Sequence, residues 1–307
     1  MSYRSSVHGP GILALASLVA LTACGGDGGG EVPAEMGTRI ADVGFMTPES
    51  ILMDTIADVY LVSSINGSPF AEDDNGFISR LSADSGRVEN LKWIDGAAPG
   101  VTLNAPKGMA IKGDTLFVTD IKCIRMFNRT TGESIASLCV DGTTFLNDIA
   151  VGPEGSLFVT DSGFNDGFAP SGTDAIYRLS LDESRPHVTL AKDAGLGAPN
   201  GIAIGSRGIF VVTYRSGEVL RFTAEGEKTV LMPASGRQLD GIAFSNDGGF
   251  LFSAWGDSTV YHVDGSGVIH RLITGVEAPA DIGYDPKRNR VLVPLFNQNA
   301  ILLRDMM

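Results

Sequence analysis

The sequence predicts an all-β fold, a six-bladed β-propeller with four antiparallel strands in each blade, and three observations lead to it. A short motif, PNGIAI at residues 199–204, returns along the chain with spacings of 58, 40, 53, 40 and 40 residues between its copies. Each copy is followed by short runs rich in β-branched and aromatic residues, which favour strands. The 39 glycines among 307 residues suit tight turns between those strands. A repeat of about 40 residues that holds four strands is the signature of a propeller blade.

The first element is an export signal at residues 1–24. Arg4 precedes an apolar core that runs from residue 12 to residue 21, and Leu-Thr-Ala-Cys occupies residues 21–24. These four residues resemble a bacterial lipobox, a signal in which the cysteine is lipidated and becomes the first residue of the mature chain. We therefore expect Cys24 to carry an acyl anchor and the protein to lie outside the cytoplasm, held to a membrane of the bacterial cell envelope. An ordinary signal peptide or a short membrane helix is the alternative, although the apolar core is short for a membrane span.

Residues 25–35 are rich in glycine and cannot bury enough apolar surface to order themselves, which predicts a flexible tether. The propeller is expected over residues 36–307. In each repeat the motif opens the first strand of a blade. Second strands are expected at 58–63, 115–120, 156–161, 208–214, 250–255 and 290–296. Third strands are expected at 77–81, 123–127, 175–181, 218–223, 259–263 and 300–304, and fourth strands at 88–94, 134–140, 187–192, 228–232 and 268–273.

The last repeat runs out of chain before its fourth strand, and residues 38–43 precede the first motif without a repeat of their own. Pairing residues 38–43 with the last blade would close the ring and remove an exposed sheet edge. An open β-solenoid, the alternative, would have shorter repeats and no use for this strand. In a propeller the residue before each first strand lies at one mouth of the central channel. The long connections 65–76, 95–105 and 163–174 fall on the same side, which makes it the expected functional face.

The second position of the motif is polar in five of its six copies, and we expect it at the channel mouth. Its occupants, in chain order, are Glu49, Lys107, Asn147, Asn200, Asp240 and Ala280. Two carboxylates and two amides would supply oxygen ligands for a hard cation such as Ca2+. They could instead solvate a water-filled channel or hold strand ends through Asx-type hydrogen bonds. On the residues alone both interpretations stay open.

The order of Glu, Asn-Asp, Asn-Gly and Asp-Gly at the starts of blades 1, 3, 4 and 5 resembles the SMP-30/gluconolactonase family, also called regucalcin-like. Members of that family are six-bladed propellers that bind one divalent metal at the channel mouth and hydrolyse lactones. The resemblance implies that Glu49, Asn200 and Asp240 are metal ligands and that Asn147 faces both metal and substrate. It implies further that Asp240 is the general base. The implied metal is Ca2+ in the first place, with Zn2+ as the other candidate.

This chain departs from the family pattern at two places. Ser50 follows Glu49 where the family has Gly-Pro, and Phe145 stands where the family often has an arginine that holds a sugar lactone. We therefore expect a lactone or another ester as substrate rather than a sugar lactone. The repeats also resemble NHL repeats, as in FVTD at 117–120 and 158–161, where we expect the aspartates to be structural. Many such propellers are not enzymes, so the competing hypothesis is an envelope protein that binds another protein or a glycan.

Lys107 and Trp255 are further candidates for substrate contact. The ammonium of Lys107 could neutralise the carboxylates in place of a metal, or polarise a substrate carbonyl, but we expect it to point to solvent. Trp255 ends a second strand near the functional face and is assigned either to blade packing or to the substrate site. His187, His262 and His270 fall in predicted third or fourth strands, away from the mouth, which argues against a Ser-His-Asp site.

Cys123 and Cys139 flank a hairpin turn and lie almost opposite each other. In an exported protein this predicts a structural disulfide, with two free buried thiols as the alternative. The formal net charge of −13 and the lack of clustered lysine and arginine argue against nucleic-acid binding. We expect a monomer whose partner is a small lactone or ester, or else an envelope protein or glycan.

Overall fold

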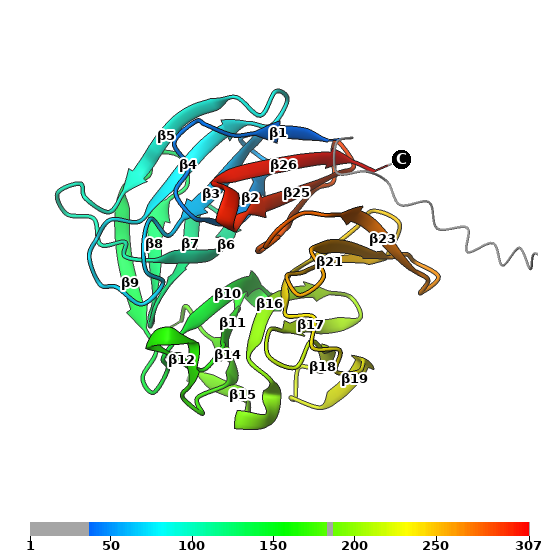
Figure 1. Ribbon diagram of the computed structural model, residues 1–307. Helices are drawn as coiled ribbons and strands as arrows, with labels where there is room; N and C mark the ends of the chain where they lie inside the picture. The colour runs from blue at the N-terminus through cyan, green and yellow to red at the C-terminus, as the bar shows by residue number, and fades with distance from the viewer. Residues whose placement is uncertain (1–36, 183–186, 307) are drawn as a thin grey trace, which may run out of the picture. The chain divides into compact units, whose positions relative to one another are not determined.

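The computed structural model describes residues 37–182 and 187–306 and confirms the six-bladed propeller. The expected signal, the lipidation site Cys24 and the tether lie outside the described residues. Each blade is a sheet of four antiparallel strands, and the blades follow one another around a central channel (Figure 1). Within the described residues, no helix is both long enough and apolar enough to cross a membrane.

The strands are named here by their position in a blade. The inner strands are β2 (Pro48–Asp54), β6 (Pro106–Lys112), β10 (Leu146–Val151), β16 (Pro199–Gly205), β20 (Leu239–Phe244) and β24 (Gly283–Asp285). The second strands are β3 (Val59–Ser64), β7 (Thr115–Asp120), β11 (Leu157–Asp161), β17 (Gly208–Thr213), β21 (Phe250–Ala254) and β25 (Arg290–Leu295). The third strands are β4 (Phe77–Ser82), β8 (Cys123–Asn128), β14 (Ala175–Leu179), β18 (Val219–Phe222), β22 (Thr259–Val263) and β26 (Ala300–Asp305).

The outer strands are β5 (Val88–Asp95), β9 (Ser134–Cys139), β15 (Val188–Lys192), β19 (Lys228–Met232) and β23 (Ile269–Thr274). The sixth outer strand is β1 (Thr38–Ile40), which pairs antiparallel with β26 and completes the last blade, blue beside red in Figure 1. This is the predicted closure, although β1 is shorter than 38–43. It ends early because Asp42 and Gly44 adopt positive φ angles of 58° and 102°, which turn the chain out of the sheet.

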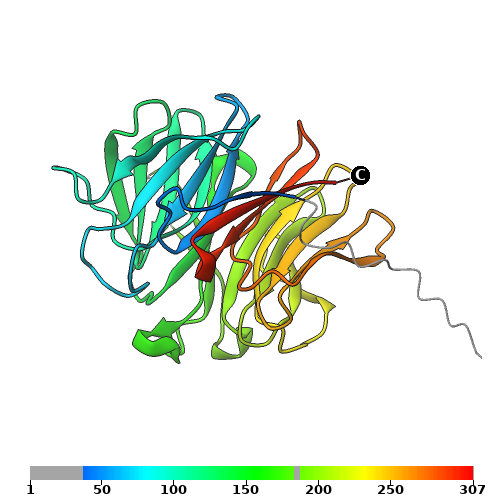
Figure 2. The same ribbon diagram turned by 45° about the horizontal axis from the view of Figure 1, so that its top comes forward.

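Four short 3-10 turns and one small hairpin complete the described structure. The turns are η2 (Pro153–Gly155), η3 (Asp166–Phe168), η4 (Ala194–Leu196) and η5 (Phe296–Gln298). The hairpin, β12 (Phe164–Asn165) with β13 (Ala169–Pro170), was not predicted and lies in the long connection 163–174 of blade 3. Figure 2 shows it, in green, projecting from the rest of its blade.

The hydrophobic core is divided into layers between neighbouring blades. Six of its clusters each join the side chains of two adjacent blades, for example Phe210 of blade 4 with Phe252 and Tyr261 of blade 5. Most inner strands and all second strands are largely buried on both faces for this reason, which explains their continuous apolar runs. Glycine at the third motif position lets inner strands approach each other. A Cβ on Gly201 would lie 2.4 Å from the carbonyl oxygen of Asp240, and one on Gly241 would lie 2.2 Å from the nitrogen of Ile282.

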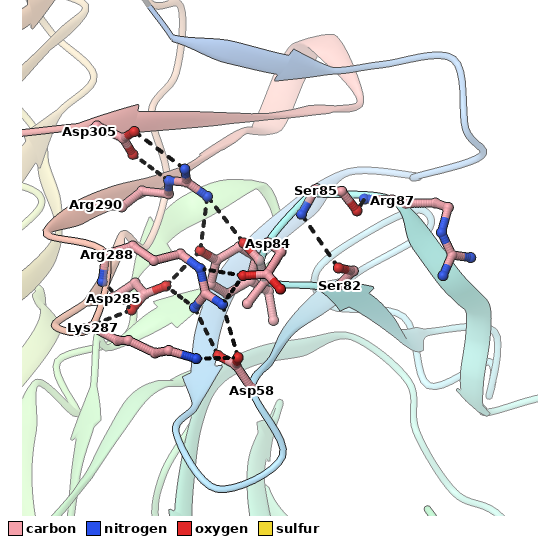
Figure 3. A network of polar contacts seen from close by, with 12 residues as sticks. Asp58, Ser82, Asp84, Ser85, Arg87, Asp285, Lys287, Arg288, Arg290 and Asp305 are labelled. Atoms are coloured by element: carbon pink, nitrogen blue, oxygen red, sulfur yellow. Dashed lines mark hydrogen bonds and ion pairs between the residues drawn. The ribbon is translucent and has the colours of Figure 1, made fainter.

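Ion pairs link the last blade to the first. Arg288, after β24, binds both carboxylate oxygens of Asp58 at 2.8 and 2.9 Å and also binds Asp285 at 2.9 Å (Figure 3). Its guanidinium further contacts Asp84 of blade 1, through Nε at 3.1 Å. Arg290 binds Asp305 and the carbonyl oxygen of residue 83. The closure therefore has a polar component besides the pairing of β1.

Candidate active site at the channel mouth

A β-bulge at the start of the inner strand positions the polar residue of the motif. In blade 3, Leu146 pairs with Asp161 but Ile149 pairs with Val159, so one extra residue is inserted between them. The same shift follows Pro106, Pro199 and Leu239, and a related one follows Pro48. A bulge interrupts the alternation of a strand and re-aims a side chain. The repeated motif therefore delivers its second residue to the channel in five blades.

All five of these residues line one cavity, and four of them bring oxygen ligands to it. Glu49, Asn147, Asn200 and Asp240 are each only 4 or 5% exposed and border a cavity of about 150 Å³. Each keeps one buried side-chain oxygen without a hydrogen-bond partner: Glu49 Oε2, Asn147 Oδ1, Asn200 Oδ1 and Asp240 Oδ1. Asn147 Nδ2 donates to Ser162 Oγ at 3.0 Å, which fixes the amide and leaves its oxygen free. Buried polar atoms without partners are rare and costly, so four such oxygens on one cavity form a fitting set of donors for a cation.

The electrostatics of the cavity also favour a cation. Burial raises the pKa of Glu49 well above its ordinary value, and the carboxylates of Asp240 and Asp281 raise it further. Burial likewise raises the pKa of Asp240, with the charge of Asp281 adding to the effect. Carboxylates that face each other out of water disfavour each other's ionisation, and a cation between them reverses this.

The donor set fits a hard divalent cation. Carboxylate and amide oxygens are ligands that Ca2+ accepts, with water filling the remaining positions. Among residues 37–182 and 187–306, no three His, Cys, Asp or Glu side chains come together as a metal site. The mouth therefore offers two carboxylates and two amides rather than the histidine and cysteine ligands typical of zinc. The residues present fit a hard divalent cation.

Lys107 lies inside the cavity wall, so the expectation that it points to solvent is wrong. The side chain is buried, and its Nζ donates to the carbonyl oxygen of Ala105 at 2.9 Å. It also lies 4.4 Å from the centroid of the Phe145 ring, a cation–π distance. Burial lowers the pKa of Lys107 to about 8, although Asp120 and Glu49 oppose the shift. The bulge after Pro106 explains why Lys107 does not point to solvent, because it turns this side chain inward like those at the equivalent positions of the other blades.

Trp255 also borders the cavity, next to Asp240. Its indole contacts Tyr214 and Phe296, with ring centroids 5.7 and 5.1 Å away. The indole N–H lies near enough to lower the pKa of Asp240 slightly, although it makes no hydrogen bond of normal geometry. Trp255 can therefore both pack between blades and face a substrate. Its contact with a substrate stays a prediction. None of His187, His262 and His270 borders this cavity.

The aspartates of the FVTD segments are structural, as expected. Asp120 accepts hydrogen bonds from the backbone nitrogens of Asn104 and Ala105, at 3.1 and 2.8 Å. Asp161 accepts from the backbone nitrogens of Phe145 and Gly163, at 2.9 and 3.0 Å. Each therefore ties the loop before an inner strand to the end of the second strand.

The sequence analysis missed a second acidic layer, one motif position further along. Asp148 Oδ2 accepts from the backbone nitrogen of Ile202 at 2.7 Å, and Asp281 Oδ2 accepts from Ser50 Oγ at 2.6 Å. Burial raises the pKa of Asp281 to about 7. Their signal in the sequence was the replacement of glycine by aspartate or serine at the third motif position of blades 1, 3 and 6.

The aromatic wall of the cavity was missed as well. Phe145, Phe164, Phe168, Tyr214 and Phe296 border it together with Trp255. They come from different connections on the functional face, so no local pattern in the sequence brings them together. Two features of the sequence pointed to this wall: Phe145 in place of the family's arginine, and two phenylalanines in the long connection 163–174.

Solved structures with the same fold include enzymes that act on different molecules. Virginiamycin B lyase from Staphylococcus aureus is 14% identical, with 88% of this chain and 99% of that chain covered and a TM-score of 0.64. A catalytically inactive variant of that enzyme with quinupristin is 15% identical over 88% and 100% of the two chains, with a TM-score of 0.59. A gluconolactonase from Xanthomonas campestris is 15% identical over 84% and 86%, with a TM-score of 0.63. At these identities the likeness shows the fold.

No curated protein sequence matches this chain. The model of the SMP-30/gluconolactonase/LRE-like region, in contrast, matches residues 74–290, which is most of the chain. Three of the four cavity oxygens lie within that region, and Glu49 precedes it. The chain therefore belongs to the SMP-30/gluconolactonase/LRE-like family.

Proposed function

We propose that this protein is a metal-dependent hydrolase of a lactone or similar ester, anchored by lipid outside the cytoplasm. The observation that carries the proposal is the convergence of four buried, unpartnered oxygens from Glu49, Asn147, Asn200 and Asp240. Membership of the SMP-30/gluconolactonase/LRE-like family supports the reaction class. The carboxylate and amide oxygens at the channel mouth are ligands that Ca2+ accepts, and they support Ca2+ as the cation.

The four oxygens would hold the cation at the mouth of the channel. A divalent cation held there would act as a Lewis acid toward an ester carbonyl. The carboxylate of Asp240 accepts the proton of the attacking water, because its buried setting makes it a better base than an exposed aspartate. The ammonium of Lys107 supplies a second positive charge in the wall, where it stabilises the negative charge that develops on the carbonyl oxygen.

The proposed location has independent support within the propeller. The structure pairs Cys123 with Cys139 in a disulfide, which is the first of the two alternatives expected for these residues. Disulfides persist in oxidising compartments, which agrees with export through the signal at residues 1–24. Labelling with a clickable fatty acid, compared between wild type and Cys24→Ala, tests the lipid anchor directly.

The catalytic proposal is tested by comparing wild type with Asp240→Asn and a control, Asp114→Asn. Asp240→Asn should lower ester hydrolysis at least about 100-fold, since it removes both a ligand and the base. Asp114 is an exposed aspartate outside the cavity, so its replacement should leave hydrolysis unchanged. Elemental analysis should find about one calcium per wild-type chain.

Two results would contradict the proposal. One is the absence of any bound cation, together with no rise in melting temperature on adding Ca2+ or Zn2+. The other is equal hydrolysis by wild type and Asp240→Asn. Binding of an envelope protein or glycan without catalysis would then become the leading hypothesis.

A further inference from the structure

Seven aromatic side chains form a connected arc around the channel mouth, called here the aromatic collar. Its members are Phe70, Phe145, Phe164, Phe168, Tyr214, Trp255 and Phe296. Neighbouring rings in the arc lie with their centroids between 4.9 and 6.2 Å apart, which is contact distance for aromatic pairs. The members come from blades 1, 3, 4, 5 and 6. The collar is therefore assembled by the whole propeller and not by one loop.

The cavity inside the collar has the size of a single small ring. Its volume is about 150 Å³, and six collar members border it together with Ile65 and Pro69. An apolar cavity of about 150 Å³ in another protein is large enough to bind one benzene molecule. The walls around the four cation-facing oxygens thus suit one flat apolar ring next to the reacting ester.

Few polar groups of the wall remain for hydroxyl groups on a substrate. The oxygens of Glu49, Asn147, Asn200 and Asp240 are assigned to the cation, and Lys107 is held by a backbone carbonyl. Of the described residues that border the cavity, the Tyr214 hydroxyl, the Trp255 indole N–H, the Asn200 amide nitrogen and the remaining N–H groups of Lys107 are left, and Lys107 is already assigned to the reacting carbonyl. A polyhydroxylated lactone would leave most of its hydroxyl groups unpaired against aromatic rings. Such unpaired groups weaken binding strongly.

Phe168 at the rim is the second observation that points to an apolar ligand. Its side chain is 50% exposed, although a phenyl ring normally avoids water. Its φ angle is 60°, in the left-handed region that favours glycine. The fold thus holds an exposed phenyl ring at the opening of the cavity in an unfavourable backbone conformation. Strained residues of this kind cluster at ligand clamps.

We propose that the site takes a small ester with one apolar ring, either a monocyclic lactone or a phenyl ester, and rejects polyhydroxylated lactones. This inference deepens the proposed function and rests on it for the reaction. Recognition of the ring, however, depends only on the collar, so binding can be measured apart from hydrolysis.

The first test compares δ-valerolactone, phenyl acetate and glucono-δ-lactone as substrates of the wild-type protein with Ca2+. δ-Valerolactone and glucono-δ-lactone share the same ring and differ in their hydroxyl substituents. We expect kcat/KM for the two apolar esters to exceed that for glucono-δ-lactone by at least about 100-fold. Equal values, or a preference for glucono-δ-lactone, would overturn the inference while leaving the hydrolase function intact.

The second test uses variants of the collar. Phe168→Ala should raise KM for phenyl acetate about 5- to 20-fold with little change in kcat, because it removes an apolar contact at the rim. Ile56→Ala is the matched control, since Ile56 is an exposed apolar residue in the turn after β2, on the other face. Tyr214→Phe should leave both constants nearly unchanged. A tenfold loss on Tyr214→Phe, or no effect of Phe168→Ala, would contradict recognition by apolar contact.

The third test separates binding from catalysis. δ-Valerolactam and benzamide resist hydrolysis and should quench the fluorescence of Trp255, whereas glucono-δ-lactam should not. Trp255→Phe should abolish the signal, which excludes a contribution from Trp93. Quenching without hydrolysis of any ester would refute the hydrolase function and support the collar as an apolar-ring site. Quenching by glucono-δ-lactam alone, or by none of the three amides, would refute the inference.

Discussion

The second and third positions of the repeated motif carry the charge of the channel. Glu49 and Asp240 occupy the second position, and Asp148 and Asp281 occupy the third, and these four buried carboxylates are near enough for their charges to raise one another's pKa. The charge of Lys107 opposes the rise in the pKa of Glu49, and the charge of Glu49 in turn opposes the fall in the pKa of Lys107. The arrangement costs folding free energy as long as no cation is bound, because each carboxylate disfavours the ionisation of the others.

A pH dependence of stability follows for the protein in a metal chelator. The folded state raises the pKa of Asp281 to about 7 by burial and also raises the pKa values of Glu49 and Asp240. Between the ordinary carboxyl pKa of about 4 and these raised values, the folded state binds more protons than the unfolded state. Stability is therefore fully present below about pH 4 and falls as the pH rises.

We expect Asp281 alone to lower the free energy of unfolding in a chelator by roughly 2–3 kcal/mol between pH 5 and pH 7.5, with Glu49 and Asp240 adding to the fall. Urea unfolding at a series of pH values measures this change. Asp281→Asn should make the fall with pH smaller by roughly that amount, and Ca2+ should restore more stability at pH 7.5 than at pH 5. A free energy of unfolding that rises with pH over this range in the chelator would refute the explanation.

At the scale of the strands, the Cys123–Cys139 disulfide joins β8 to the outer strand β9 in the outer half of blade 2. The two residues are paired directly across the hairpin and are 16 residues apart in sequence. Closing a loop of this length constrains the unfolded chain by about 3 kcal/mol. The outer strand β9 is mostly exposed and has little buried apolar surface of its own, so the covalent link stabilises it.

Replacing both cysteines by serine should lower the free energy of unfolding by about 2–3 kcal/mol without changing the activity of the site. Urea unfolding of wild type and the double variant measures the loss. A reducing agent should destabilise wild type and leave the double variant unaffected. An unchanged unfolding midpoint in the double variant would show that the disulfide is not stabilising.

At the scale of the whole molecule, the ring depends on how its last blade meets its first. β1 pairs with β26, a hydrophobic cluster joins Leu292 and Ile301 to Tyr60 and Val62, and Arg288 bridges Asp58, Asp84 and Asp285. The side chain of Arg288 is only 12% exposed and that of Asp285 is fully buried. The hydrogen bonds of Arg288 are therefore shielded from solvent better than those of an ordinary surface ion pair.

Arg288→Ala should destabilise the propeller by about 1.5–3 kcal/mol, because it leaves the buried carboxylate of Asp285 short of a charged donor. Arg87→Ala is the control, since Arg87 lies nearby with its side chain 70% exposed and should change stability by less than about 0.5 kcal/mol (Figure 3). Thermal unfolding measures both. Equal effects of the two substitutions would contradict a special role for Arg288 in closure.

Much of this architecture is predictable because its signals are local and repeated. The spacing of the motif and the apolar runs after it determine the number of blades, the strand order and the closing role of residues 38–43. The cluster of Glu49, Asn147, Asn200 and Asp240 was predictable too, because equivalent positions in a closed ring must meet at its centre. The hairpin of β12 and β13 was not, because three glycines and no clear alternation occupy that connection.

The sequence by itself thus determined the propeller and the four oxygens of its mouth. Only the tertiary structure decided that Lys107 turns inward, that Asp148 and Asp281 form a second acidic layer, and that aromatic rings from four blades enclose the cavity. The physical reason is that the direction of a side chain at a bulge and the contacts between long loops depend on neighbours distant in the chain. The sequence repeat determines where equivalent residues lie in the ring, and the packing of loops from different blades determines which side chains surround them.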